Sequence, residues 1–302
     1  RAVAGDPSQM QIMYGISGER HLTESTVDWL PGYENSAPVR IGNAASDQFQ
    51  LDVYGEVLDA QEYARDKGIE ATEEAWSLQL QFADFVEKHW QEPDDGIWEV
   101  RGGRKHFTHS KVMAWVAIDR TVRGIRDHGL PGDAQHWQKL ADKIHADVLE
   151  KGINADRNCF TQYYGSNEMD ASLLVIPQVG FLPLDDERII NTIHAVEKDL
   201  DKNGMILRYR ADSTDDGLTG EEGTFIMCSF WLVECLAMIG EVQKAQMLFD
   251  RLLDIRNDVG LLSEEYDTVH HRMLGNMPQA FSHVGLINAA LALLDAHSPD
   301  AA

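Results

Sequence analysis

The sequence predicts an all-α protein built from repeated helix pairs. Two kinds of apolar pattern predict helices and alternate along the chain, and glycines follow at a nearly constant spacing. The length of 302 residues is sufficient to bury a large core. From these observations we expect one domain over residues 1–302 with the architecture of an (α/α)6 toroid, or six-hairpin barrel.

The first kind of predicted helix is amphipathic. Trp137, Leu140, Ile144 and Val148 fall on one stripe of a helix, and polar residues fill the opposite face. A helix of this type packs one face on a core and keeps the other in water, so we assign these segments to an outer layer. They are expected at residues 73–90, 134–150, 185–200 and 241–256.

The second kind of predicted helix is apolar or small around much of its circumference. The run from Phe225 to Val233 leaves no polar face, which predicts a helix that is buried on all sides. These segments alternate with the amphipathic ones and are assigned to an inner layer. They are expected at residues 44–64, 108–124, 168–178, 222–239 and 279–295.

Five glycine turns recur between the two kinds of helix. One glycine after a helix is ordinary, because glycine readily ends a helix in the left-handed conformation. A shared period of 52 to 56 residues is informative and predicts a helix-pair repeat. Since each turn leads from an outer to an inner helix, we expect all five at one end of the array, where side chains from different repeats converge. The glycines are Gly42, Gly96, Gly152, Gly204 and Gly260.

The predicted helices are too few to close a ring. Five inner and four outer segments predict a toroid that is incomplete at its N-terminus, with about nine of the twelve helices of a complete ring. The inner helices at 44–64 and 279–295 would then face an open seam. An exposed apolar seam predicts a homo-oligomer or poor solubility.

Composition excludes several classes of function. The 43% apolar and 25% charged fractions are typical of a soluble globular protein, and no apolar run is long enough to span a membrane. The net charge of −24 disfavours nucleic acid as a partner. Cys159, Cys228 and Cys235 lack metal-site spacing. Cys228 and Cys235 lie two turns apart in an apolar helix and are expected in the core, and we expect a cytoplasmic protein that uses neither a metal nor a cofactor.

Glu99 is a candidate proton donor. Ile97 and Trp98 precede it, and apolar neighbours raise the pKa of a carboxyl group by desolvation, as a general acid requires. The indole of Trp98 also offers a flat face for a sugar ring. The alternative is a core Trp98 beside an ion pair of Glu99 with Arg101 or Arg104, and an isolated Trp-Glu pair favours that alternative.

Glu264 occupies the matching turn of the last repeat, directly before Glu265 and Tyr266. One carboxylate is suited to activate a water molecule, and the other to position that water or to bind a sugar hydroxyl. A solvated turn is the alternative. The matched positions of Glu99 and Glu264 favour a pair that hydrolyses a glycosidic bond, one carboxyl protonating the leaving oxygen while the other activates water.

Further polar side chains are expected at the same end of the array. Arginines suit sugar hydroxyls, whereas acidic residues at the start of a helix are explained equally well by the helix dipole. The candidates for substrate binding, besides Trp98 and Glu265, are Arg208, Tyr209, Arg40, Asn43, Asp47 and Glu222.

Histidines support a different toroid enzyme. His106 and His109 have the spacing of a metal pair, but no third ligand is evident. A sugar epimerase would instead use histidines for proton transfer, and it requires His106, His109 or His283 to converge in a central pocket. This alternative stays open at the level of the sequence.

Several blocks in order resemble glycoside hydrolase family 15, the glucoamylases and the related bacterial trehalases, and the trehalase-like branch more closely. The resemblance covers nearly the whole chain and implies an (α/α)6 barrel that hydrolyses an α-linked glucoside, trehalose or a short α-glucan, with inversion. It implies Glu99 as general acid, Glu264 as general base, an Arg208–Tyr209 pair in contact with substrate, and Trp98 as a subsite wall. The blocks are residues 11–15, 39–45, 50–56, 95–99, 228–234 and 260–267.

One departure from the family keeps an alternative open. The resemblance implies an Arg-Asp pair, in the first inner helix and the turn before it, that grips the sugar whose bond is cut, and this sequence has no such block. The alternative function is a catalytically inert or partner-dependent helical remnant that binds carbohydrate or protein. For the enzyme, the inverting class predicts roughly 6.5–9.5 Å between the carboxyl groups of Glu99 and Glu264.

Overall fold

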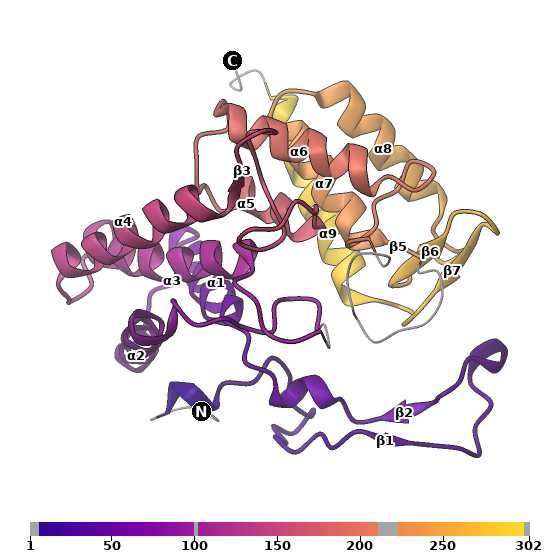
Figure 1. Ribbon diagram of the computed structural model, residues 1–302, viewed down its shortest axis with the longest axis horizontal. Coiled ribbons are helices and arrows are strands. Elements are labelled where there is room, and N and C mark those ends of the chain that lie inside the picture. Colours follow the sequence, from indigo (N-terminus) through magenta and orange to yellow (C-terminus); the bar gives the residue numbers. More distant parts are fainter. Residues whose placement is uncertain (1–5, 100–101, 211–222, 299–302) are drawn as a thin grey trace. The chain divides into compact units, whose positions relative to one another are not determined.

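The computed structural model describes residues 6–99, 102–210 and 223–298, and these are mostly helical (Figure 1). The chain divides into two compact units. The first unit comprises Arg1–Glu99, Gly103–His106 and Met113–Lys143, and the second comprises Val100–Gly102, Phe107–Val112 and Ile144–Ala302. The expectation of one catalytic domain stays a prediction.

The described residues contain nine α-helices and four short 3-10 helices. The α-helices are α1 (Asp52–Asp66), α2 (Glu73–His89), α3 (Thr108–Arg126), α4 (Ala134–Lys151), α5 (Val175–Gln178), α6 (Glu187–Leu200), α7 (Ile226–Met238), α8 (Val242–Asp254) and α9 (Ala280–Ala296). The 3-10 helices are η1 (Pro7–Gln9), η2 (Tyr33–Asn35), η3 (Ala44–Asp47) and η4 (Ala171–Leu174).

Short strands lie in the connections between the helices, and every pairing is antiparallel. Strand β6 lies between β5 and β7, and in this small sheet Phe225 pairs with Glu265. The strands are β1 (Ser25–Thr26), β2 (Arg40–Ile41), β3 (Ile153–Asn154), β4 (Cys159–Phe160), β5 (Thr224–Phe225), β6 (Glu265–Asp267) and β7 (Arg272–Leu274).

The four segments predicted as outer helices form α2, α4, α6 and α8, and three of those predicted as inner helices form α3, α7 and α9. Their assignment to two layers of a toroid stays a prediction. Two inner predictions were too long. The segment 44–64 starts as η3 and becomes α-helical only at Asp52. The segment 168–178 is η4 followed by a single α-turn, because Pro177 lacks an N–H and Gly180 turns the chain at φ +72°.

Three of the predicted glycine turns follow an outer helix in the left-handed conformation: Gly96, Gly204 and Gly260, at φ +71°, +79° and +82°. Gly152 also follows an outer helix, but without a positive φ. The prediction for Gly42 was wrong, because this glycine follows the β1–β2 ribbon instead of a helix.

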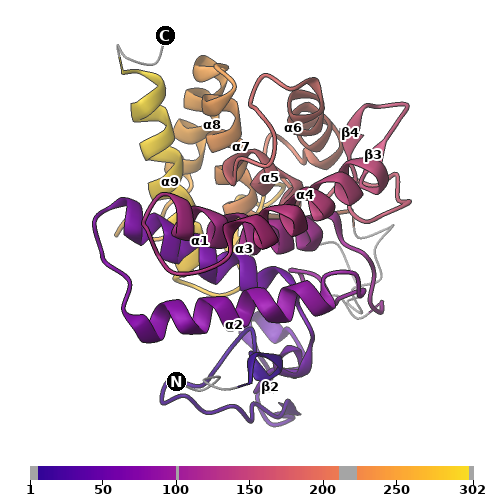
Figure 2. The ribbon, with the colours of Figure 1, turned by 90° about the vertical axis from the view of Figure 1, so that its left-hand side faces the viewer.

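In the first unit, α1 packs closely on its neighbours (Figure 2). A Cβ atom added at Gly55 would lie 2.2 Å from the carbonyl oxygen of Met113, so the backbones of α1 and α3 approach as only glycine allows. The ring of Tyr54 stacks on Phe85 at 4.9 Å and meets the edge of Phe82 at 5.6 Å. These aromatic contacts join α1 to α2.

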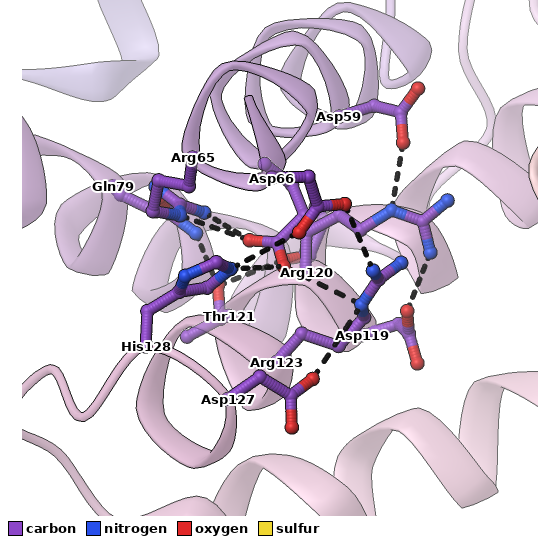
Figure 3. Close-up of polar contacts among 12 residues, drawn as sticks. Asp59, Arg65, Asp66, Gln79, Asp119, Arg120, Thr121, Arg123, Asp127 and His128 are labelled. Atoms are coloured by element: carbon purple, nitrogen blue, oxygen red, sulfur yellow. Dashed lines mark hydrogen bonds and ion pairs between the residues drawn. The ribbon is translucent and has the colours of Figure 1, made fainter. Parts of the chain in front are cut away.

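A buried ion-pair network also holds α1, α2 and α3 together (Figure 3). The side chain of Glu62 is 2% exposed, and one of its oxygens accepts hydrogen bonds from Nε and Nη2 of Arg65, at 3.0 and 2.6 Å. Its other oxygen lies 3.1 Å from Nε2 of His128 and 3.4 Å from Nε of Arg123. Arg65 in turn donates to Gln79 of α2 at 3.0 Å.

In the second unit, α7 forms the centre and packs on α6, α8 and α9. Cys228, Phe230 and Val233 are fully buried, which confirms most of the predicted all-apolar surface. The hydroxyl of Ser229 is buried too, and it accepts a hydrogen bond from the N–H of Ile206 at 2.9 Å. The three cysteines of the chain are buried free thiols, as predicted for Cys228 and Cys235.

The outer side of α9 is apolar and exposed. Five of its side chains, spaced three or four residues apart, are 49–65% exposed and lie along one face of the helix. We call this face the α9 stripe. It consists of Phe281, Val284, Ile287, Leu291 and Leu294. None of the helices in the described ranges is long and apolar enough to cross a membrane.

The substitution Glu62→Ala tests how much the buried network contributes to the free energy of unfolding. It leaves the guanidinium of Arg65, which is 5% exposed, without its carboxylate, and we expect the free energy of unfolding to fall by about 3–5 kcal/mol. The control is Asp127→Ala, because this carboxylate is 60% exposed and lies 3.9 Å from Arg123. The control should change stability by less than about 0.5 kcal/mol in urea denaturation. Equal losses in the two variants would contradict the assignment.

Candidate active site

The connections at the starts of the inner helices pair with one another in the second unit. Phe107, directly before α3, pairs with Tyr163, and Asp170, directly before η4, pairs with Tyr209. The same relation holds between Phe225, before α7, and Glu265. In each case the residue before one helix meets the loop that follows a later glycine turn. The loop after Gly152 therefore pairs with the loop after Gly204, which in turn pairs with the loop after Gly260.

Side chains connect these loops further. The amide of Gln162 donates to Oδ2 of Asp170 at 3.0 Å, and both side chains are buried. The N–H of Ala171 donates to the carbonyl of Arg208 at 2.8 Å, and the N–H of Phe225 donates to that of Ile206 at 3.1 Å. The loops thus form one connected rim on the second unit.

Glu264 is held on this rim by its backbone and by its side chain. The carbonyl of Glu264 accepts the N–H of Ile226, the first residue of α7, at 3.1 Å. Its Oε2 accepts hydrogen bonds from the backbone N–H and the side-chain amide of Asn276, at 3.0 and 3.1 Å. The amide of Gln279 approaches Oε1 at 3.5 Å. The half-buried carboxylate is therefore fixed in one orientation.

Glycines lie directly beside both carboxylates of the Glu264–Glu265 pair. A Cβ added at Gly275, which has a φ of +71°, would lie 2.7 Å from Oε2 of Glu264. A Cβ added at Gly223 would lie 2.8 Å from Oε2 of Glu265, and the N–H of Gly223 donates to the same oxygen at 3.1 Å. Each carboxylate occupies the space that a side chain at the neighbouring glycine position would need.

Arg208 lies over aromatic rings. Its guanidinium carbon is 4.7 Å from the ring centre of Tyr209 and 5.2 Å from that of Phe225. Tyr209 is 1% exposed, so its ring supports the arginine from the interior. Of the Arg208–Tyr209 pair, the half-buried Arg208 is the member that is accessible from outside.

Glu99 lies in the first unit, in the turn that follows Gly96. Its backbone adopts a φ of +58°, which is uncommon for a residue with a side chain. The amide of Asn43 donates to Oε2 of Glu99 at 3.5 Å. Both Glu99 and Trp98 are half-buried. The alternative ion pair with Arg104 was wrong, because Nε of that arginine binds Asp95 at 3.1 Å, and Arg101 lies outside the described residues.

The structure places the remaining candidates in different surroundings. Asn43 caps η3 by accepting the N–H of Ala45 at 2.8 Å, and its amide reaches Glu99. Arg40 is exposed in β2, where it pairs with Glu24 at 3.4 Å. Asp47 is exposed in η3. Glu222 lies outside the described residues.

The residues that hold the Glu264 carboxylate and the Glu99 turn were not among the predicted site residues. Asn276 and Gln279 donate to Glu264, and Asp94 and Asp95 accept backbone N–H groups beside the Glu99 turn. Gly275-Asn276 is a turn signal that was available in the sequence. Nothing in the sequence indicated which carboxylate this turn would contact.

The three histidines of the epimerase alternative lie in different surroundings. His283 donates from Nδ1 to the carbonyl of Gln279 at 2.7 Å, and its Nε2 accepts the N–H of Leu262 at 3.3 Å. Burial lowers the pKa of His109 to about 4, so its imidazole is neutral near pH 7. His106 is exposed in the first unit. His283 therefore has a structural role at the N-terminus of α9.

One group in the described residues has ligand atoms close enough for a metal ion. Atoms of Glu62, Asp66 and His128 lie within 4.8 Å of one another. However, Arg123 already lies 3.4 Å from Glu62 and 3.3 Å from Asp66, and Arg65 binds Glu62 as well. A divalent cation would compete with these guanidinium groups, so we assign the cluster to the stability of the first unit.

A cavity of about 280 Å³ lies beside β6 in the second unit. Tyr266 and Asp267 line it, together with His270, whereas Glu264 and Glu265 do not. Hydrogen bonds from His270 lower the pKa of Asp267 to about 2. The carboxylate of Asp267 is thus bound within its own turn, by His270 and by the N–H of Val269. We do not assign this cavity to the candidate active site.

The sequence matches one family over nearly its whole length. The model of the family described as "Glycosyl hydrolases family 15" matches residues 1–291. The trehalase of Mycobacterium tuberculosis is 47% identical over 287 residues, which cover 95% of this chain and 42% of that protein. The trehalase of Mycolicibacterium smegmatis is 46% identical over 293 residues, which cover 97% of this chain and 44% of that protein. The chain thus spans less than half the length of these two relatives.

Solved structures show the same fold. A glycosidase in complex with glucose superposes with a TM-score of 0.69 at 22% sequence identity, over 87% of this chain and 74% of that one. Identity at this level supports the mostly helical fold alone. The resemblance drawn from the sequence blocks is confirmed by the family match and by the relatives.

Gly275→Ala tests the contact between Gly275 and Glu264. The new methyl group would collide with the Glu264 carboxylate and displace it from Asn276. A matched control is Gly260→Ala, which has a similar φ of +82° but no neighbouring atom within 4 Å. Both variants should lose about 1–2 kcal/mol from left-handed strain, and Gly275→Ala about 1 kcal/mol more through its lost hydrogen bonds. Equal losses in denaturant titrations, with Glu264 unmoved in a crystal structure, would contradict this account.

Proposed function

Because the chain belongs to glycosyl hydrolases family 15, we propose that it carries the acid and base of an inverting α-glucoside hydrolase. Glu99 is the general acid and Glu264 the general base. The substrate is a small carbohydrate, trehalose or an α-linked gluco-oligosaccharide. The trehalases at 46–47% identity favour trehalose.

One observation carries this proposal: Glu99 and Glu264 have equivalent local settings. Each lies a few residues after a left-handed glycine that follows an outer helix, α2 in one case and α8 in the other. Each carboxylate also receives the side-chain amide of an asparagine, Asn43 at 3.5 Å and Asn276 at 3.1 Å. Two carboxylates prepared in the same way suit the two proton transfers of glycoside hydrolysis.

The reaction follows from the two roles. Glu99 donates its proton to the glycosidic oxygen as the bond between that oxygen and the anomeric carbon breaks. Glu264 accepts a proton from a water molecule whose oxygen bonds to the anomeric carbon from the opposite face. One water is consumed, and the configuration at the anomeric carbon inverts. Asn276 keeps the Glu264 carboxylate in the orientation that accepts this proton.

The other candidates have supporting roles in this proposal. Trp98 offers a wall for a sugar ring, and Arg208, supported by Tyr209, presents its guanidinium to sugar hydroxyls. Glu265, held by the N–H of Gly223, is placed to bind a further hydroxyl. Arg40, Asn43, Asp47 and Glu222 stay predicted substrate contacts, and the amide of Asn43 also donates to Glu99.

We also propose that the alternating inner and outer helices belong to an (α/α)6 toroid that forms a single catalytic domain. The likeness to solved glycosidase and glucoamylase structures supports this, with TM-scores of 0.69 and 0.66. A toroid gathers the loops after its glycine turns at one end, as the connected loops of the second unit illustrate.

The central test is glucose release from trehalose, maltose and maltotriose by the complete natural polypeptide to which these residues belong. Glu99→Gln and Glu264→Gln should each lower kcat at least about 100-fold, because each removes one proton transfer. Glu74→Gln, an exposed residue of α2, is the control and should retain activity. For trehalose, proton NMR should show α- and β-glucose released in equal amounts, because the attacked anomeric carbon is inverted and the leaving glucose keeps its α configuration. Release of α-glucose alone, or activity in both variants, would refute the proposal, and an inactive but folded protein would favour the inert remnant.

The α9 stripe supports a proposal about assembly. Five exposed apolar side chains on one helix favour contact with a second copy of the chain. Sedimentation velocity should show a dimer, and Ile287→Glu combined with Leu291→Glu should dissociate it. Met247→Glu, on an isolated side chain of α8 that is 75% exposed, is the control and should leave the dimer intact. A monomer at every concentration of the unsubstituted protein would rule this out.

A further inference from the structure

Two consecutive aspartates precede the turn that carries Glu99. Asp94 is fully buried, and its Oδ2 accepts the N–H of Leu51 at 3.1 Å and that of Gly96 at 3.3 Å. Leu51 is the residue directly before α1. The Asp94 carboxylate therefore ties the start of the Glu99 turn to the start of an inner helix.

Asp95 forms a second tie in the same direction. Its Oδ2 accepts the N–H of Phe49 at 2.8 Å and Nε of Arg104 at 3.1 Å. Its own N–H donates to the carbonyl of Phe49 at 2.8 Å. The guanidinium carbon of Arg104 also lies 5.4 Å from the ring centre of Phe49. Asp95 thus joins the segment before α1 to both sides of the Glu99 loop.

The backbone completes this arrangement. Asp94 and Lys105 exchange two N–H to carbonyl hydrogen bonds, each 3.0 Å long. Glu99 lies between these paired residues in the sequence. The loop that carries the proposed acid is therefore closed at its base, and the base is attached to α1 through two carboxylates. We call Asp94 and Asp95 the carboxylate clamp.

The clamp explains how Glu99 keeps an uncommon backbone conformation. A non-glycine residue at φ +58° is strained, and such strain persists only where the surroundings fix the chain. Burying the charge of Asp94 is unfavourable by itself. Burial and, after it, the nearby charge of Asp94 raise the pKa of Asp52 well above its usual range. The hydrogen bonds to Leu51 and Gly96 offset that cost.

We propose that Asp94 and Asp95 are positioning residues for the general acid, holding the Glu99 turn against the start of α1 so that the carboxyl group of Glu99 meets the glycosidic oxygen. The inference rests on the proposed function and adds to it two residues that touch no substrate. A shift of about 1 Å in a catalytic group costs on the order of 100-fold in rate, so such residues have a measurable effect.

Two substrates distinguish positioning of the acid from a general structural role. Hydrolysis of trehalose requires protonation of the leaving oxygen, whereas fluoride leaves from α-D-glucosyl fluoride without a proton donor. In the complete natural polypeptide, Asp94→Ala and Asp95→Ala should lower kcat for trehalose about 30-fold or more and kcat for the fluoride less than about 3-fold, with little change in KM. Asp94→Asn retains one acceptor oxygen and should recover most of the activity on trehalose.

Two controls accompany these variants. Asp84→Ala removes an exposed aspartate from α2 of the same unit and should leave both activities unchanged. Glu99→Gln removes the acid itself and should lose trehalose hydrolysis while keeping hydrolysis of the fluoride. Far-UV circular dichroism establishes that each variant is folded, and Asp95→Ala keeps the test decisive if Asp94→Ala does not fold.

Each outcome has a separate meaning. Equal losses on both substrates in the clamp variants would overturn the positioning role in favour of a merely structural one. Retained trehalose hydrolysis in folded clamp variants would overturn it too. If Glu99→Gln itself retains trehalose hydrolysis, the proposed function fails, whatever the clamp variants do. A selective loss on trehalose in both Glu99→Gln and the clamp variants supports the proposal.

Discussion

The structure depends on how the loops before the inner helices satisfy their backbone polar groups. A loop at the end of a helical layer is partly buried, and its N–H and carbonyl groups need partners. Here each loop finds them in the loop of another repeat, as in the pairs of Asp170 with Tyr209 and Phe225 with Glu265. This pairing fixes the backbone that carries Glu264 and Glu265. The helices supply stability, and the paired loops supply the geometry of the site.

The two candidate carboxylates are held in the same way, each by the side-chain amide of an asparagine. Glu264 is held by Asn276, and Glu99 by Asn43, while the aspartates beside the Glu99 turn attach that turn to α1. A catalytic group is effective when its surroundings fix it before the substrate arrives. These asparagines and aspartates contact carboxylate or backbone atoms, and they contribute by orienting the two glutamates.

The sequence was most informative where structure follows from periodicity. Apolar spacing predicted α2, α4, α6 and α8 closely, and the uniformly apolar run predicted the burial of α7. The segment 168–178 was predicted too long because Pro177 breaks a pattern that is otherwise helical. The β1–β2 ribbon before Gly42 was missed, since two-residue strands have no periodicity. The supports of the carboxylates, Asp94 and Asn276 among them, depend on tertiary neighbours that no local pattern encodes.

The central claim is that Glu99 and Glu264 act as acid and base on one glycosidic bond. The most direct measurement is the distance between their carboxyl groups in a crystal structure of the complete polypeptide. If the two glutamates have these roles, their carboxyl groups lie roughly 6.5–9.5 Å apart, which leaves room for the attacking water of an inverting enzyme. A separation of about 5–5.5 Å would indicate a retaining mechanism. Carboxyl groups much farther apart, or on surfaces that do not face each other, would contradict the assignment.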